Sequence, residues 1–208
     1  MQYTFYFDAS KCTGCKTCQV ACKETYQLPV NNLYRKVYNY TGGSWKLDEA
    51  TGTYTPDGVF GYFVSAACNH CEKPACVESC PVGAMQKDPE TGIVWVDQQV
   101  CIGCKTCVSV CPYAAPTFRD DLGVSSKCDM CKTEVDAGGK PLCVTACPMR
   151  ALDWGPVEDM LAKYGEGNIE IEPLPKNTTG AVTIVNPHPD AQPSGEGTGF
   201  VANLAEEL

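Results

Sequence analysis

The sequence has few of the residues that enzymes use for acid–base chemistry. It contains only two histidines, His70 and His188, among 208 residues. No run approaches the roughly 18 apolar residues that argue for a membrane-spanning helix, and no C-x-x-C-H motif for haem attachment occurs. The first residues, Met1–Phe7, lack the basic region and apolar core of a secretory signal. We therefore expect no catalytic site and no direct membrane span, and export only in the company of another protein.

Positive charge is also scarce. Sixteen lysines and arginines face 25 aspartates and glutamates, which gives a formal net charge of −9. Because nucleic-acid affinity comes largely from cations that neutralise phosphates, we expect no nucleic-acid partner. Cysteine supplies much of the hydrophobic fraction of 44%. We therefore expect bound metal to replace part of an ordinary core and to be needed for folding.

Cysteine is what the chain has in abundance. Sixteen cysteines form four groups of four: Cys12, Cys15, Cys18, Cys22; Cys68, Cys71, Cys76, Cys80; Cys101, Cys104, Cys107, Cys111; and Cys128, Cys131, Cys143, Cys147. The first and third groups, here called the compact runs, read C-x2-C-x2-C-x3-C, the ligand pattern of bacterial two-cluster ferredoxins. The second and fourth, the expanded runs, carry extra residues between their second and third cysteines. Sixteen thiolates predict four [4Fe–4S] clusters.

Two other uses of cysteine are disfavoured. A disulfide framework belongs to small secreted chains, and this sequence shows no export signal. Structural zinc sites usually join two separated C-x2-C pairs, whereas each compact run has three cysteines at two-residue gaps. Cys80, Cys111 and Cys147 are each followed by proline, as in ferredoxins. Iron–sulfur clusters fit this pattern best.

Spacing alone leaves the pairing of the runs open. The first run could pair with the second and the third with the fourth, or the first with the fourth and the second with the third. Met85–Lys87, a turn at 88–92 and Ile93–Val96 predict a strand–turn–strand unit between the second and third runs. Such a unit commonly joins the halves of a small ferredoxin, so we favour the second arrangement.

The rest of the chain predicts an α+β protein with irregular additions. Tyr3–Phe7 reads as a strand, and residues 34–67 as a strand-rich insertion with turns at Gly42–Gly43 and Pro56–Gly58. Pro156–Tyr164 predicts a short helix ended by Gly165. Pro, Gly and Asn are frequent after residue 165, so we expect an extended tail that wraps a partner. Its apolar residues are Val182, Ile184, Phe200, Val201 and Leu204.

Residues near the cysteines could tune cluster potentials, because nearby cations and hydrogen bonds favour the reduced, more negative cluster. The candidate cations are Lys11, Lys16, Lys105, Lys127 and Arg150, of which Arg150 is the first choice. His70, between Cys68 and Cys71, could donate a hydrogen bond to sulfur. Trp95 and Tyr113 are expected to pack and to shield clusters from water.

The phrases CTGCKTCQVACK, CNHCEKPACVESCPVGAM, VCIGCKTCVSVCPYAAP and KPLCVTACPMRALDWGP resemble the four-cluster iron–sulfur subunit of DMSO reductase and its molybdoenzyme relatives. The resemblance implies a duplicated bacterial ferredoxin-like fold of class α+β. One unit would comprise residues 1–33 and 112–164, and the other residues 68–111. Residues 34–67 would be the insertion and 165–208 the partner-wrapping tail.

The resemblance also implies four crossed ligand sets. They are Cys12, Cys15, Cys18 and Cys147; Cys22, Cys128, Cys131 and Cys143; Cys68, Cys71, Cys76 and Cys111; and Cys80, Cys101, Cys104 and Cys107. These are numbered sets 1 to 4. In the family, set 1 lies nearest the molybdopterin subunit and set 4 nearest a quinol-oxidising membrane anchor. Because Cys104 is a cysteine, we expect a four-iron rather than a three-iron cluster in set 4.

The function that the resemblance implies is electron transfer in a complex. The partners would be a catalytic subunit with molybdopterin (bis-guanine dinucleotide) and a membrane anchor with a quinol site. The chain itself would be non-catalytic and held at the membrane by its partners. We expect the extracytoplasmic face, reached with a twin-arginine-bearing catalytic subunit, or else a cytoplasmic complex. A free polyferredoxin and a structural zinc scaffold are the alternative functions, and the substrate of the catalytic partner is open.

Overall fold

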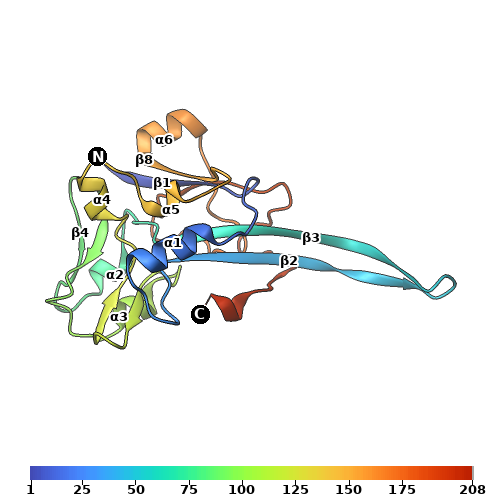
Figure 1. The fold of residues 1–208 in the computed structure, drawn as a ribbon, viewed down its shortest axis with the longest axis horizontal. Coiled ribbons are helices and arrows are strands. Elements are labelled where there is room, and N and C mark those ends of the chain that lie inside the picture. The colour runs from blue at the N-terminus through green and yellow to red at the C-terminus, as the bar shows by residue number, and fades with distance from the viewer. Residues whose placement is uncertain (208) are drawn as a thin grey trace.

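One long β-hairpin projects from a body of short strands and helices (Figure 1). The computed structural model describes residues 1–207. The strands are β1 (Tyr3–Asp8), β2 (Arg35–Asp48), β3 (Thr53–Ala67), β4 (Met85–Lys87), β5 (Val94–Val96), β6 (Thr117–Arg119), β7 (Val124–Ser126), β8 (Leu152–Pro156), β9 (Ile184–Asn186) and β10 (Phe200–Val201). The helices are α1 (Thr17–Thr25), α2 (Ala75–Glu78), α3 (Thr106–Val110), α4 (Lys132–Asp136), α5 (Leu142–Thr145) and α6 (Val157–Tyr164), with a 3₁₀ turn, η1, at Leu204–Glu206. The mixture of helices and strands bears out the α+β class.

The N-terminal strand is the centre of a three-stranded sheet of order β8-β1-β9. β1 pairs antiparallel with β8 and parallel with β9. Every residue of β1 after Tyr3 is buried, Phe5 and Phe7 almost completely, so both faces of this strand are covered. The strand predicted at Tyr3–Phe7 is confirmed and extends by one residue to Asp8.

The C-terminal tail folds back on its own chain. It supplies β9, in which Ile184 and Val185 are buried, and β10, which pairs with β2. Phe200 and Leu204 stay 64% and 53% exposed. The tail therefore buries part of its apolar surface within the molecule, and its contact with a partner stays a prediction for the exposed residues.

The strand-rich insertion is a single hairpin of β2 and β3, and the two turns predicted inside it are wrong. The chain reverses between Asp48 and Thr53, where the Gly52 N–H bonds the Asp48 carbonyl at 2.8 Å. Gly42–Gly43 and Pro56–Gly58 instead face each other across the ladder, where the register shifts between Gly42 and Ser44. Residues that favour turns locally form a bulge here, because the long ladder on either side outweighs their preference.

Two other expectations are confirmed. β4 and β5 form the antiparallel pair predicted between the second and third runs. α6 ends at Tyr164, followed by Gly165 with φ of 76°, a conformation that suits glycine. Within residues 1–207 no helix is both long enough and apolar enough to cross a membrane.

The compact runs fold alike. Gly14 and Gly103 have φ of 68° and 70°, and Lys16 and Lys105 are left-handed at 59° and 60°. Each helix begins one residue before the third cysteine, at Thr17 and Thr106. The helix therefore begins directly after the left-handed lysine and before the fourth cysteine of each run. α1 packs against α5, and α2 against α3.

Candidate metal centres

All sixteen cysteines are free thiols, and none forms a disulfide. They gather where the compact and expanded runs meet. Within residues 1–207, no three histidine, cysteine or acidic side chains converge closely enough for a single metal ion. A tetrahedral zinc site would need four thiolates at about 2.3 Å from one point. In a cubane each cysteine binds a different iron, so its ligands stand farther apart.

The first site is a hollow of about 320 Å³, including its open side, between the first and fourth runs. Its lining includes Cys12, Cys15, Cys18 and Cys147, and the other walls are largely apolar, with Phe7, Val37 and Leu152 among them. We call it the N-terminal hollow. Cys15 is exposed at its mouth, whereas Cys18 and Cys147 are buried. Four thiols from two distant runs thus face one space.

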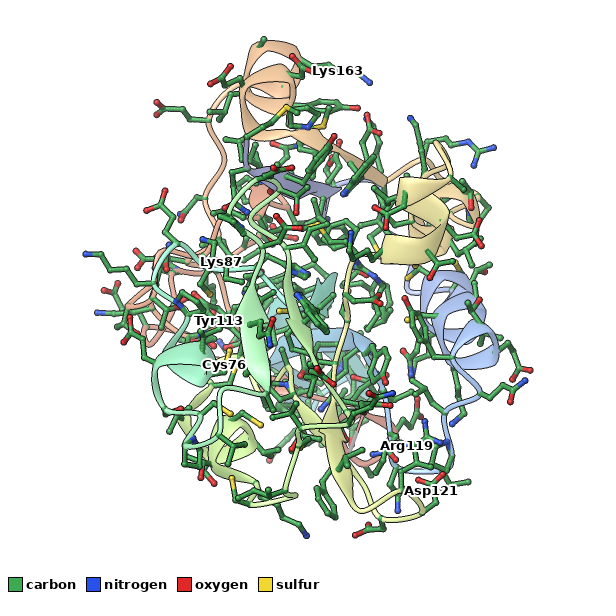
Figure 2. All side chains as sticks on the ribbon, turned by 90° about the vertical axis from the view of Figure 1, so that its left-hand side faces the viewer. Cys76, Lys87, Tyr113, Arg119, Asp121 and Lys163 are labelled. Carbon is green, nitrogen blue, oxygen red and sulfur yellow. The ribbon has the colours of Figure 1, made fainter. Side chains whose placement is uncertain are left out.

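The second site is a hollow of about 380 Å³ between the second and third runs, here called the central hollow. It is lined by Cys68, Cys71, Cys76 and Cys111. Tyr113 also lines it, and Figure 2 shows Cys76 and Tyr113 close together on this side of the molecule. This position suits the shielding role expected for Tyr113.

The third site is a group of four buried thiols, Cys22, Cys128, Cys131 and Cys143, whose charges act on one another's pKa. Burial raises the pKa of the Cys22 thiol to about 12, and the neighbouring charges of Cys143 and Cys131 add to the effect. Burial likewise raises the pKa of Cys128 well above its usual value. The charges of Cys22, Cys68 and Cys143 raise it further. Cys128 therefore lies near both this group and the central hollow.

The fourth site, the outer group, contains Cys80, Cys101, Cys104 and Cys107. Burial raises the pKa of the Cys107 thiol, and a hydrogen bond with Ser125 lowers it by a smaller amount. The charges of Cys101 and Cys104 raise it further. Cys80 packs in the same small apolar cluster as Cys76 and Cys107. Cys104 is exposed. This is the most open of the four groups.

The donor chemistry of these groups fits iron–sulfur clusters. Burial raises the pKa of Cys12 to about 11 and that of Cys76 to about 12, so thiolates there require a compensating positive charge. Iron ions supply that charge when a cluster is bound, and each cluster can take up and release one electron. Sets of four thiols are the usual ligands for such clusters.

Several donors already point at cysteine sulfurs. Backbone N–H groups bond the sulfurs of Cys80, Cys101, Cys128 and Cys147 at 3.3–3.5 Å. Thr179, in the tail, donates its hydroxyl to Cys71 Sγ at 3.1 Å. No sequence pattern marked Thr179, because it is 108 residues from Cys71 and only the folded tail brings it there. Hydrogen bonds of this kind stabilise charge on cluster sulfurs.

Short helices connect neighbouring groups. Cys18 and Cys22 lie four residues apart on α1 but belong to the N-terminal hollow and the buried group respectively. Cys76, on α2, belongs to the central hollow, and Cys80 follows that helix into the outer group. Side chains four residues apart in a helix are neighbours, about 5–6 Å between Cβ atoms. Cys128, whose neighbours include Cys22 and Cys68, connects the buried group with the central hollow, so the four groups form a series.

The candidate tuning residues lie in different surroundings. Arg150 is exposed and donates to the carbonyls of Cys147 and Thr145. Lys105 is exposed over the Phe118 ring, 4.0 Å from its centre, and Lys16 pairs with Glu206 and Glu207. Lys127, by contrast, is 4% exposed. Arg35, which sequence reasoning missed because it lies 13 residues beyond the nearest cysteine, is 3% exposed.

His70 is fully buried, and its Nδ1 accepts the Val94 N–H at 2.8 Å. Burial lowers its pKa well below the usual value, helped by the charges of Lys127 and Lys87. A neutral imidazole that accepts at Nδ1 carries its proton at Nε2. Within residues 1–207 that Nε2 has no hydrogen-bond partner. A cluster sulfur would satisfy it, so the donor role of His70 stays a prediction.

Two protein-family models match the chain. A model described as "4Fe-4S dicluster domain" matches residues 59–157, and one described as "4Fe-4S binding domain" matches residues 3–24. The chain is thus a ferredoxin-like iron–sulfur protein.

Full-length relatives narrow the class. The chain is 44% identical over 206 residues to the B subunit of anaerobic dimethyl sulfoxide reductase from Escherichia coli (strain K12), covering 99% of this chain and 98% of the relative. The same protein of Haemophilus influenzae is 44% identical over the same span. Thiosulfate reductase electron transfer subunit PhsB of Salmonella typhi is 34% identical over 184 residues, 88% of this chain and 91% of the relative. The chain belongs to the family of DMSO reductase iron–sulfur subunits.

Proposed function

We propose that this chain is the electron-transfer subunit of a molybdopterin reductase of anaerobic respiration. It would hold four [4Fe–4S] clusters and relay electrons from a quinol pool, or another donor, to the catalytic subunit. The chain itself would be non-catalytic. The observation that carries the proposal is the pair of hollows, each lined by four thiols from two different cysteine runs.

The crossed ligand sets are part of this proposal. Set 1 matches the lining of the N-terminal hollow, set 3 that of the central hollow, and sets 2 and 4 the buried and outer groups. The contacts of α1 with α5 and of α2 with α3 support pairing the first run with the fourth and the second with the third. On this basis we propose two ferredoxin-like units, residues 1–33 with 112–164 and residues 68–111.

Exposure supports a relay with two open ends. The N-terminal hollow has the exposed Cys15 and the outer group the exposed Cys104, whereas no cysteine of the two middle groups is exposed. An electron must enter and leave near the surface, while buried middle centres are protected from water. We propose that the Cys15 end faces the molybdopterin subunit and the Cys104 end a quinol-oxidising membrane anchor, with the complex on the extracytoplasmic face.

A free polyferredoxin is the second candidate, and the hairpin argues against it. Trp45, Leu47 and Tyr54 are 50–65% exposed near its end, far from the body (Figure 1). Exposed apolar residues clustered on a projecting element are typical of a subunit interface. A carrier that must dissociate from several partners does not need a projecting hairpin with exposed apolar residues.

The test is elemental analysis of the complex isolated anaerobically through a tag on this chain. The proposal predicts molybdenum or tungsten together with about sixteen iron atoms per copy of this chain. Iron in that amount without either metal, and without a second protein, would support the free polyferredoxin. Zinc in place of iron would overturn both, and the preparation would then be colourless rather than brown.

A further inference from the structure

Two buried cations stand out in a molecule whose other lysines and arginines reach solvent. In residues 1–207 only Arg35 and Lys127 among these residue types are buried, at 3% and 4% exposure. Neither forms an ion pair with a carboxylate of that part of the chain. Burying a charge without a partner is strongly unfavourable. Something else must compensate both charges.

Arg35 lies between the N-terminal hollow and the buried group. Its Nη1 donates to Ser65 Oγ at 3.1 Å, and the same Oγ lies 3.5 Å from Cys18 Sγ. Burial lowers the pKa of the Arg35 guanidinium, but the charges of Cys143, Cys18, Cys128 and Cys22 outweigh burial and raise that pKa, which indicates cysteines of both groups beside it. The guanidinium therefore has cysteines of two ligand sets as neighbours.

The remaining surroundings of Arg35 offer no anion. Its guanidinium carbon lies 4.8 Å from the centre of the Phe5 ring. A small cavity beside it is lined mostly by apolar side chains, among them Phe7, Leu152 and Val185. Its Nη2 is buried and has no hydrogen-bond partner within residues 1–207. An unsatisfied charged donor at this place points to an acceptor that the polypeptide does not supply.

Lys127 lies between the buried group and the central hollow. It precedes Cys128 in the chain and lines the central hollow with Cys76 and Cys111. Its Nζ donates to the carbonyls of Val94 and Cys128. These carbonyls hold the ammonium in place but do not cancel its charge. The neighbouring His70 carries no negative charge in either protonation state, so it cannot cancel it either.

We propose that Arg35 and Lys127 are fixed counter-ions of the clusters and that each raises the reduction potential of the two clusters beside it. Arg35 would act on the clusters of sets 1 and 2, and Lys127 on those of sets 2 and 3. An oxidised cubane with four thiolates is already negative, and reduction adds one more negative charge. A buried cation therefore stabilises the reduced form more than the oxidised form.

Neither Arg35 nor Lys127 would change the reduction potential of the set 4 cluster. Around Cys80 the donor to sulfur is an uncharged backbone group, the Met85 N–H, at 3.5 Å from Sγ. Its nearby lysine, Lys105, is exposed and screened by solvent. The inference rests on the proposed function, since it requires the four clusters.

The test is redox potentiometry followed by electron paramagnetic resonance on the intact anaerobic complex. Arg35→Gln and Lys127→Met remove one charge each, and Lys46→Met removes one from the hairpin, where Lys46 is exposed and pairs with Asp57. We expect each inner variant to lower two of the four midpoint potentials. One centre should respond to both variants, the fourth to neither, and Lys46→Met should change none.

Charge-preserving variants separate charge from shape. Arg35→Lys and Lys127→Arg should keep the potentials close to those of the unmodified protein. If a neutral variant loses clusters, the proposal predicts that the charge-preserving variant restores them. Lost iron that the charged variant does not restore, or four unchanged potentials at full iron content, would overturn the proposal. An unmodified complex with far fewer than about sixteen iron atoms per chain would instead refute the four-cluster function itself.

Discussion

The two compact runs have nearly the same sequence and backbone but very different surroundings. In both, a left-handed glycine and a left-handed lysine precede the helix, and a threonine hydroxyl lies 3.3–3.4 Å from the second cysteine's sulfur. The first run leads into the nine-residue α1 and lies under the hairpin and the tail. The second leads into the five-residue α3 and exposes Ile102. Local sequence thus determines the ligand loop, whereas distant segments determine what packs against it.

The largest effects should come from the cysteines, which test whether each run serves two clusters. Cys12→Ser and Cys147→Ser should lose the same cluster, as should Cys22→Ser and Cys128→Ser. Each variant should contain about four fewer iron atoms per chain, or a cluster with altered spectra. Electron paramagnetic resonance of the reduced proteins compares them.

Cys104 of the second compact run and Cys80 of the first expanded run provide the matched pair. Cys104→Ser should resemble Cys80→Ser and leave the spectra of the other centres intact. If Cys22→Ser instead matches Cys80→Ser, the crossed arrangement is wrong.

The two glycines should differ in their tolerance of a methyl group. Both have φ near 70°, so alanine costs about 1–2 kcal/mol at either position. At Gly14 the added carbon would lie 2.4 Å from the Phe63 ring, a side chain that can move. At Gly103 it would lie 2.4 Å from the Gly123 carbonyl oxygen, which is backbone. Gly103→Ala should therefore release iron at a lower temperature than Gly14→Ala.

A double variant sharpens this comparison. Phe63→Leu should recover part of the loss caused by Gly14→Ala, because it removes the ring that the methyl group meets. The same change should do nothing for Gly103→Ala. Equal losses for the two alanine variants, with no recovery, would mean that the backbone conformation alone sets the cost.

Replacing the lysine before each helix should have the next largest effects, and the effect should differ between Lys16 and Lys105. Lys16 pairs with Glu206 and with Glu207, whose side chain is fully buried and also accepts the Val37 N–H at 3.1 Å. Lys16→Met leaves the Glu207 carboxylate buried and poorly compensated, which should cost about 1–3 kcal/mol. Hydrogen exchange of the C-terminal segment should increase, while the N-terminal hollow retains its iron. Unchanged exchange would show that this ion pair does not hold the segment.

Lys105→Met should have the smallest effect. Lys105 is exposed and lies over the face of Phe118, an interaction of about 0.5–1 kcal/mol at the surface. Thermal release of iron from this variant should shift by less than from Lys16→Met. A larger shift would mean that the second compact run depends on its lysine more than the first compact run does.

The same contrast between local and distant segments explains which features could be predicted. The cysteine spacing, β1, the β4–β5 pair and the end of α6 at Gly165 depend on neighbouring residues, and all were predictable. The hairpin turns were not, because Gly43 and Gly58 lie opposite each other in a ladder formed by residues far apart in the chain. Arg35 and Thr179 could not be found either, since only the folded hairpin and tail bring them to the cysteines.

We propose that each of the four thiol groups drawn from crossed runs holds one [4Fe–4S] cluster. Native mass spectrometry of the anaerobically purified protein tests it most directly, because the mass above the polypeptide counts clusters of defined composition. We predict a main species with four [4Fe–4S] clusters, about sixteen iron atoms in all. A main species with two clusters, with a three-iron cluster or with zinc would refute this assignment.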